Sequence, residues 1–437
     1  MMRHARGYVT VVVGVVAALL MPASAAGSQA YVEGSVGEVP NAVAVSDDGL
    51  IAASLYDAQA VALVTPDGAV RRAALDCSPA DVAIAPAGAT PGAVCQESEH
   101  LNVIDVASLQ VSTASMNVGG LDSIVYLPAV DELIIGSLEG WVLAIDEVSG
   151  GGYVVRMRSE FPLDAPHRVT ELAPLSDGGG TYAITDGGDL LYADLEFGGQ
   201  YAIIARATSE RSFQSISMSP FDTALYGVVI DSSGPQVATT VEEIDMATGD
   251  ARQSVPLLVA DGFFSTLDLV AAYRAVYVTS GVGVETPSGL NGLLTARVDD
   301  KGQVGDVQPA PVAAAGGSGT AVSADFSRVA FGATDGRALG ILIDDVPYPT
   351  AIRVTARAKG TKVTLSGSTT SMRPLTSLNV YIKDLTKKKA RFAKQSKAAV
   401  VNYEGRIAWS GKAPSKRFAV YVSGDGAKSA TVTVKVR

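Results

Sequence analysis

The fold is decided by residues 41–68, which read NAVAVSDDGLIAASLYDAQAVALVTPDG. Three apolar segments at 42–45, 50–54 and 60–64 are separated by short polar breaks, and a fourth follows at 69–75. Asp, Gly, Ser and Pro fill the breaks, where a turn needs a positive φ or a local side-chain hydrogen bond. The stretch therefore predicts a unit of four short β-strands.

Variants of this unit recur over about 300 residues. Each third segment ends in an apolar residue followed by an acid or a turn residue, and successive ends are 40 to 54 residues apart. The seven ends are Val64-Thr65, Ile104-Asp105, Ile145-Asp146, Ala193-Asp194, Ile244-Asp245, Val298-Asp299 and Ile343-Asp344. A period of this size built from short strands is typical of a β-propeller, whereas helical repeats would place apolar residues at 3.6-residue spacing. We therefore predict an all-β protein with a seven-bladed propeller over residues 31–346.

The two ends of the repeat array complement each other. The last unit lacks a fourth strand before Pro347 and Pro349, while the apolar segment 31–36 precedes the first unit without a partner. We expect segment 31–36 to supply the missing strand, because closing the ring in this way removes open sheet edges.

Residues 350–437 form a different module. Apolar and polar residues alternate in about seven segments, such as 378–383 and 430–436, which predicts a small immunoglobulin-like β-sandwich. Trp409 and Tyr421 are its expected core aromatics.

The N-terminus has the pattern of a secretory signal peptide. Arg3 and Arg6 precede an apolar run at 11–21, and Ala23-Ser24-Ala25 offers a cleavage site of small residues. The alternative is a membrane anchor, but the run is shorter than the roughly 20 residues that span a bilayer. We expect residues 1–25 to be removed, no transmembrane segment to remain, and the protein to be secreted or associated with the cell envelope.

The chain has two cysteines, Cys77 and Cys95. An even number in an oxidising compartment favours a disulfide, and two buried thiols are the alternative. Such a bond would stabilise the second blade and would have no redox role, because the chain has no Cys-x-x-Cys motif.

Charge divides the chain in two. Residues 26–347 contain 13 Lys and Arg against 42 Asp and Glu, whereas residues 348–437 contain 19 against 3. The candidate polyanion-binding residues of the basic module are Lys387, Lys388, Lys389, Arg391, Lys394 and Lys397. An anionic cell-wall polymer or acidic lipid is the expected partner of an exported protein. Two alternatives are that the basic module docks on the acidic propeller of its own chain and that its cations only face solvent. Nucleic acid is not an expected partner, because few aromatic residues near the basic run could stack on bases.

No catalytic constellation is identified. His100 and His167 belong to different repeats, and the chain contains neither Gly-x-Ser-x-Gly nor His-Glu-x-x-His. We therefore name no catalytic residue, expect no cofactor, and find no support for a divalent cation in the propeller channel. Insertions at 231–240 and 281–292 indicate a partner-binding face on blades five and six, or merely unselected variation in loop length.

The repeats resemble the YVTN and lactonase-like seven-bladed propellers of secreted bacterial proteins. The resemblance depends on Val276-Tyr277-Val278-Thr279-Ser280, on the strand 182–186 and on Ser219-Pro220. The C-terminal module resembles the Ig-like modules of bacterial surface proteins. The resemblance implies a circular scaffold with a central channel, and some members of the family are lactone hydrolases, quinoprotein-like dehydrogenases or metal-dependent lyases. No position here matches their active-site motifs.

Three hypotheses of function follow. The first is a non-enzymatic extracellular binding or scaffold protein, whose propeller recognises a protein, peptide or glycan while the basic sandwich holds it near the anionic envelope. The second is a propeller hydrolase or lyase with its site in the central channel. The third is a structural component of a surface assembly.

Overall fold

The structure is a computed structural model that describes residues 34–436, except for 87, 89, 129, 149–151, 161–166, 197–198, 200, 235–236, 260–266, 273–274, 281–291, 300–301, 311–318, 333–337, 344–351, 370–376, 402–405 and 425–426. The segment predicted to be a signal peptide lies outside the described residues. In the described part all regular elements are β-strands, so it contains no helix that could cross a membrane.

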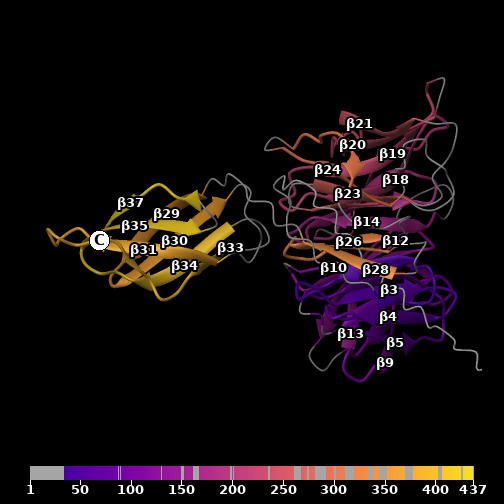
Figure 1. Ribbon diagram of the computed structural model, residues 1–437, viewed down its shortest axis with the longest axis horizontal. Coiled ribbons are helices and arrows are strands. Elements are labelled where there is room, and N and C mark those ends of the chain that lie inside the picture. Colours follow the sequence, from indigo (N-terminus) through magenta and orange to yellow (C-terminus); the bar gives the residue numbers. More distant parts are fainter. Residues whose placement is uncertain are drawn as a thin grey trace, which may run out of the picture.

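Seven sheets of four antiparallel strands follow one another along the chain and form a propeller (Figure 1). Blades one to three contain β2 (Ala42–Val45), β3 (Ile51–Leu55), β4 (Ala60–Val64), β5 (Val70–Ala74), β6 (Pro79–Ile84), β7 (Pro91–Cys95), β8 (His100–Ile104), β9 (Val111–Ser115), β10 (Leu121–Leu127), β11 (Glu132–Ser137), β12 (Trp141–Val148) and β13 (Gly152–Glu160). Blades four and five contain β14 (Val169–Pro174), β15 (Gly180–Thr185), β16 (Leu190–Asp194), β17 (Tyr201–Ala205), β18 (Arg211–Met218), β19 (Leu225–Asp231), β20 (Ala238–Ile244) and β21 (Ala251–Val259). Blade six contains β22 (Leu267–Ala271), β23 (Ala275–Ser280), β24 (Gly292–Arg297) and β25 (Gln308–Pro309).

Blade seven joins the two ends of the array. It contains β26 (Thr320–Val322), β27 (Arg328–Gly332), β28 (Ala338–Ile343) and, as its outer strand, β1 (Gly34–Ser35). β1 pairs antiparallel with β28, which confirms that the N-terminal segment closes the ring. Val36, which directly follows β1, is fully buried between blades seven and one.

The core of the propeller consists of seven apolar clusters, one between each pair of neighbouring blades. The middle strands, such as β3 and β4, are buried along their whole length because both of their faces meet a neighbouring blade. The outer strand β5, in contrast, is mostly exposed. This packing explains why the sequence shows short continuous apolar runs as well as alternation.

The strand directions give the propeller two faces. One face carries the connections that lead into the innermost strand of each blade, together with the connections between the second and third strands. We call this face the entry face. The insertion at 231–240 lies on this face, between the end of β19 and the start of β20. The insertion at 281–292 lies outside the described residues except for Gly292, but β23 and β24, which flank it, end and begin at the same face.

The C-terminal module is a nearly closed sandwich. Its strands follow the order β29-β30-β34-β33-β31-β35-β36, with β32 paired to β31 and β37 paired to β35. They are β29 (Ile352–Lys359), β30 (Lys362–Thr369), β31 (Ser377–Asp384), β32 (Ala393–Lys394), β33 (Ala399–Val401), β34 (Arg406–Lys412), β35 (Arg417–Gly424), β36 (Ala427–Lys428) and β37 (Val432–Lys435). The module is shown in orange and yellow in Figure 1.

One of the two predicted core aromatics of the sandwich is correct. Trp409 is buried in the core, and its indole N–H donates to the carbonyl of Lys397 at 2.8 Å. The prediction for Tyr421 is wrong. Its neighbours Val420 and Val422 enter the core, so Tyr421 projects from the opposite face of β35, where it is half-buried.

Candidate functional site

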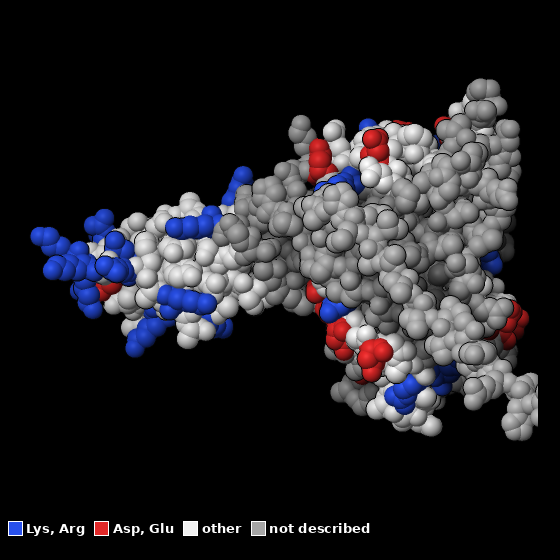
Figure 2. All heavy atoms as spheres, viewed as in Figure 1, with Lys and Arg blue, Asp and Glu red and all other residues white. Residues whose placement is uncertain are grey.

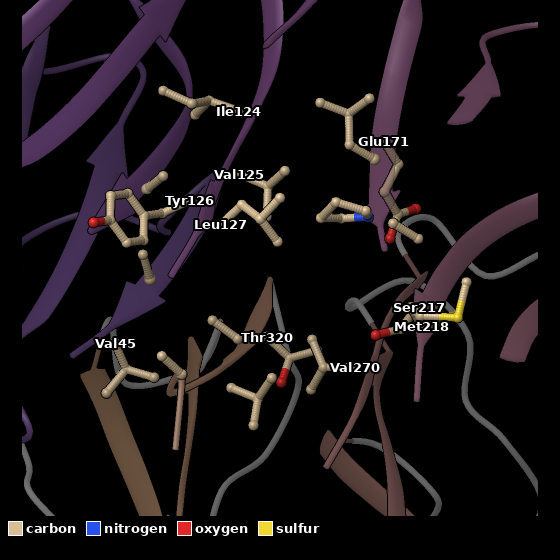
Figure 3. Close-up of a pocket in the computed structure, with 18 of the residues that line it drawn as sticks. Val45, Ile124, Val125, Tyr126, Leu127, Glu171, Ser217, Met218, Val270 and Thr320 are labelled. Atoms are coloured by element: carbon tan, nitrogen blue, oxygen red, sulfur yellow. The ribbon is translucent and has the colours of Figure 1, made fainter. Parts of the chain in front are cut away.

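A cavity of about 300 Å³ lies where the innermost strands of all seven blades meet (Figure 3). Apolar side chains form most of its wall, among them Val125, Leu127 and Val270, and Glu171 lies on the wall with them. A concave, mainly apolar cavity with few polar groups is the usual form of a ligand site. This channel is therefore the first place to look for function.

A local distortion of the innermost strands positions the polar groups of the channel. In blades two to five, each innermost strand has a β-bulge with one extra residue just before a polar one. The extra residues are Ala80, Asp122, Thr170 and Gln214. A bulge redirects the side chain that follows it, and bulges are frequent next to functional sites.

The residues that follow the four bulges alternate in chemistry around the ring. They are Asp81, Ser123, Glu171 and Ser215, two acids on even blades and two hydroxyls on odd blades. Blades six and seven continue the alternation with Asp268 and Thr320 near the starts of β22 and β26. The hydroxyl residues are buried and the three acids are half-buried, and all six line the cavity except Ser215, which lies behind Glu171 and Asp268.

Each acid binds the next blade in the ring. The Asp81 carboxylate accepts the Ile124 amide at 2.8 Å, and the Asp268 carboxylate accepts the Thr320 amide at 2.6 Å. The Glu171 carboxylate accepts the Ser215 hydroxyl at 2.8 Å. The three acids thus connect blades two to three, four to five and six to seven.

Burial gives these acids unusual protonation behaviour. Burial raises the pKa of Asp81 to about 7 and that of Asp268 to about 6. The hydrogen bonds from the next blade favour the ionised forms and lower both pKa values, but burial has the larger effect. The pKa of Glu171 is raised well above its ordinary value, first by burial and then by the negative charge of Asp268. Strongly shifted acids at a cavity are candidates for function.

A second polar group lies on the entry face, next to the starts of the innermost strands β10 and β14. The buried Asp122 accepts a hydrogen bond from Gln96, and Arg168 lies 3.7 Å from carboxylate oxygens of both Asp122 and Asp186. Nδ1 of His167 lies 3.2 Å from the Asp186 carboxylate. This group connects blades two, three and four on the entry face.

Carboxylates also connect blades at the opposite face. Asp47 accepts the amide of Asp325 at 2.9 Å, joining blades one and seven. Asp222 accepts the amide and the hydroxyl of Ser176, joining blades five and four. Burial is the main reason that the pKa of Asp47 is raised to about 6.

The residues singled out in the sequence are distributed as follows. Cys77 and Cys95 form a disulfide with a Cα–Cα distance of 6.2 Å, between the entry to β6 and the end of β7. His100 lies 3.2 Å from the Ser98 hydroxyl on blade two, and the structure does not bring it together with His167. Among the described residues no group of three or more His, Cys, Asp or Glu side chains could hold a metal ion.

The six predicted polyanion-binding residues all belong to the sandwich and are all exposed. Lys387, Lys388, Lys389 and Arg391 lie in the connection between β31 and β32, and Lys394 is on β32. Lys387 lies 3.8 Å from the carboxylate of Asp384. Figure 2 shows Lys and Arg side chains gathered over the sandwich and particularly at its left end.

Sequence reasoning placed the propeller acids in turns and at strand ends and missed the three in the channel. A signal was present, because Asp81, Glu171 and Asp268 are each the only charged residue of an innermost strand that is mainly apolar. An acid inside a buried strand requires a partner, and here the partner is the next blade.

Comparison with known proteins supports the fold. No protein-family model matches the chain, and no curated relative does. Two solved structures are similar over most of their length: hydrazine synthase from Kuenenia stuttgartiensis, with a TM-score of 0.54, 14% identity and coverage of 70% of this chain and 96% of that one, and a chain of the mitotic checkpoint complex, with a TM-score of 0.51, 14% identity and coverage of 77% and 98%. At this identity the similarity shows a shared propeller fold and nothing about activity.

Proposed function

We propose that this chain is a non-enzymatic, extracytoplasmic binding protein whose propeller takes a basic segment of a protein or peptide at its entry face. In this proposal a Lys or Arg side chain of the partner reaches Asp81, Glu171 and Asp268, which lie near the starts of the innermost strands. The basic sandwich, which we take to be an Ig-like module, holds the propeller near an anionic cell envelope.

The observation that carries the proposal is the placement of Asp81, Glu171 and Asp268 on alternate blades around one cavity. Each carboxylate keeps a hydrogen bond to a fixed group of the next blade, so the acids are held in place before a partner arrives. Preorganised groups lose little conformational entropy on binding. The excess of acids in residues 26–347 would also attract a basic partner from a distance.

The shifted acids add a pH dependence. A cation beside a carboxylate favours its ionised form and lowers its pKa. Binding of a basic partner should therefore release protons, and affinity should rise as the pH passes from 5 to 8 through the pKa values of Asp268 and Asp81, about 6 and about 7.

The proposal is tested with an oligolysine peptide as probe. The triple variant Asp81→Asn, Glu171→Gln, Asp268→Asn keeps a carbonyl acceptor at each position and removes three titratable carboxyl groups. The matched control Asp67→Asn, Asp105→Asn, Asp245→Asn removes three carboxyl groups from turns of the opposite face, where Asp67 and Asp105 are exposed and Asp245 is half-buried. We expect the channel triple to weaken binding at pH 8 by about tenfold or more and the control by about twofold or less.

Two results would overturn the proposal. One is an equal loss in both triples, which would mean that the peptide senses only net charge. The other is wild-type affinity that does not rise between pH 5 and 8, a measurement that remains valid if the channel triple does not fold.

A second function is favoured by one observation, the raised pKa values of the channel acids. A carboxyl group with a pKa near neutrality suits general acid–base catalysis, as in a lactonase-like hydrolase or a lyase. Turnover of a panel of lactones that is lost in Asp81→Asn would support this alternative over the binding function.

A further inference from the structure

One face of the sandwich combines aromatic rings and lysines. Along β31, Leu378, Val380 and Ile382 enter the core, so Tyr381 and Lys383 project from the other side of the sheet. Tyr421 lies directly opposite Tyr381 on the paired strand β35. Lys394 on β32 is the cross-strand partner of Tyr381 on its other side.

The aromatic rings of this face form one stack. Tyr381 and Tyr421 lie parallel with centroids 4.9 Å apart, and the ring of Phe392 meets Tyr421 edge-on at 4.8 Å. All three rings are half-buried. Stacked and edge-on pairs are the favoured arrangements of aromatic rings, so the cluster is a rigid support on a strand-paired surface.

Lysines surround the rings. The ammonium group of Lys428 lies 4.1 Å from the centroid of Tyr421, and that of Lys383 lies 5.9 Å from the centroid of Phe392. Cation–π contacts of this kind restrict a side chain that would otherwise be mobile. Lys394, the exposed cross-strand neighbour of Tyr381, adds a third lysine beside the cluster. We call this surface the tyrosine–lysine face: Tyr381, Lys383, Phe392, Lys394, Tyr421 and Lys428.

This geometry separates two kinds of polyanion. Single-stranded nucleic acid is held by bases that stack on open aromatic rings. Here Tyr421 is stacked on Tyr381, met by Phe392 and covered by Lys428, so its ring is already occupied. The face therefore offers ammonium groups and tyrosine hydroxyls to a ligand, and these are donors for acidic groups and for sugar hydroxyls.

We propose that the tyrosine–lysine face binds an anionic polysaccharide, with the lysines on its acidic groups and the hydroxyls of Tyr381 and Tyr421 on its sugar hydroxyls. Charge complementarity supports this ligand, because residues 348–437 have 19 Lys and Arg against 3 Asp and Glu. The order of the strands supports it too: β32, β31, β35 and β36 lie side by side at about 4.8 Å per strand. Lys394 on β32, Lys383 on β31 and Lys428 on β36 therefore form a short row along which a polymer can lie. The inference rests on the part of the proposed function that brings the sandwich to an anionic envelope, and it is independent of what the propeller binds.

The test uses the full chain and polygalacturonate, a polymer of uronic acids, at fixed ionic strength. The face triple Lys383→Gln, Lys394→Gln, Lys428→Gln is compared with the loop triple Lys387→Gln, Lys388→Gln, Lys389→Gln, which removes the same charge from the neighbouring connection. We expect the face triple to weaken binding about tenfold or more and the loop triple about twofold. The methyl-esterified polymer, which has lost its charge, should bind neither protein.

A third variant distinguishes binding at the tyrosine–lysine face from attraction by net charge alone. Tyr381→Phe with Tyr421→Phe keeps the ring stack and removes both hydroxyls, so it should leave the melting temperature unchanged and weaken polymer binding by about threefold. Equal losses in the face and loop triples would overturn the assigned face. Oligothymidylate and vesicles with anionic lipids are tested in the same way. If either binds more tightly than polygalacturonate and the face triple loses that binding, the polysaccharide is the wrong ligand and the face is a nucleic-acid or lipid site. Binding of oligolysine at the propeller is measured separately, so failure of one proposal leaves the other intact.

Discussion

The propeller and the sandwich place their charges in opposite ways. The propeller carries acids inside its ring, where Asp81, Glu171 and Asp268 hold neighbouring blades together and line the channel. The described core of the sandwich contains no charged side chain: its buried polar groups are the indole N–H of Trp409 and the hydroxyls of Thr369 and Ser429. The predicted polyanion-binding cations all lie on its surface. The net charges of the two units therefore differ in origin. Some acids of the propeller hold neighbouring blades together, whereas the cations of the sandwich lie on its surface and can contact a partner.

The difference follows from how each unit closes. A sandwich encloses its core between two sheet faces, so alternation along a strand separates apolar from charged residues. A propeller packs its sheets face to face around an axis, and at this axis the unpaired edges of the innermost strands carry backbone groups that need partners. The inward acids supply partners for amides of the following blade, at the cost of desolvating a carboxylate.

Opening the ring should produce the largest difference in stability between the propeller and the sandwich. Starting the chain at Glu38 removes β1 and Val36, leaves β28 with an open edge and exposes the apolar cluster between blades seven and one. We expect the propeller transition to fall by on the order of 10 °C in a calorimetric scan, while the sandwich transition stays in place. An unchanged propeller transition would show that β1 does not close the ring.

The core of the sandwich should be sensitive to one residue and insensitive to its neighbour on the surface. Trp409→Ala leaves a cavity in the apolar core and should destabilise the sandwich by about 3–5 kcal/mol. Tyr421→Ala removes a ring from the outer face and should cost only about 1 kcal/mol. Denaturant unfolding measures both, and equal losses would place Tyr421 in the core after all.

The disulfide should stabilise the propeller alone. Cys77 and Cys95 close a loop with a sequence separation of 18. In the chain-entropy account a loop of this size contributes about 3 kcal/mol, so Cys77→Ala with Cys95→Ala should lower propeller stability by that amount. A reductant should have the same effect on the wild type and none on the double variant, and a reductant effect on both would point to another cause.

The channel acids should give the propeller a pH dependence of stability. The pKa of Asp81 is about 7 in the folded chain and 3.8 as an unperturbed group, so the folded state binds its proton more tightly. This stabilisation is complete below pH 4 and is lost as the pH rises through 7, with about 1.4 kcal/mol for each unit of pKa difference. Asp81→Asn should therefore flatten the fall in the free energy of unfolding between pH 4 and 8.

Asp67 provides a control of opposite sign. The Thr65 hydroxyl lowers the pKa of this exposed acid, so its contribution to stability is lost as the pH falls. Asp67→Asn should leave the fall between pH 4 and 8 unchanged. A flattening as large as that of Asp81→Asn would contradict the role given to the buried acid.

The repeat made the fold readable from sequence. The third-strand endings, from Val64-Thr65 to Ile343-Asp344, define seven units, and the unpaired apolar segment before Asn41 predicts the closure that β1 makes. The inward direction of Asp81 and Glu171 could not be predicted, because a bulge at Ala80 or Thr170 shifts the register by one residue and no composition pattern reports that shift. Tyr421 was misplaced for a related reason: alternation identifies two faces of a strand, and only packing decides which one is buried.

The most direct measurement is a crossed calorimetric titration of the full chain with oligolysine and with polygalacturonate. The account predicts two independent sites: the triple Asp81→Asn, Glu171→Gln, Asp268→Asn loses only the peptide, and the triple Lys383→Gln, Lys394→Gln, Lys428→Gln loses only the polymer. Prior saturation with one ligand should leave the affinity for the other unchanged. If the lysine triple instead strengthens peptide binding, the sandwich occupies the acidic propeller in the same chain, and the division into an inward acidic site and an outward basic face is contradicted.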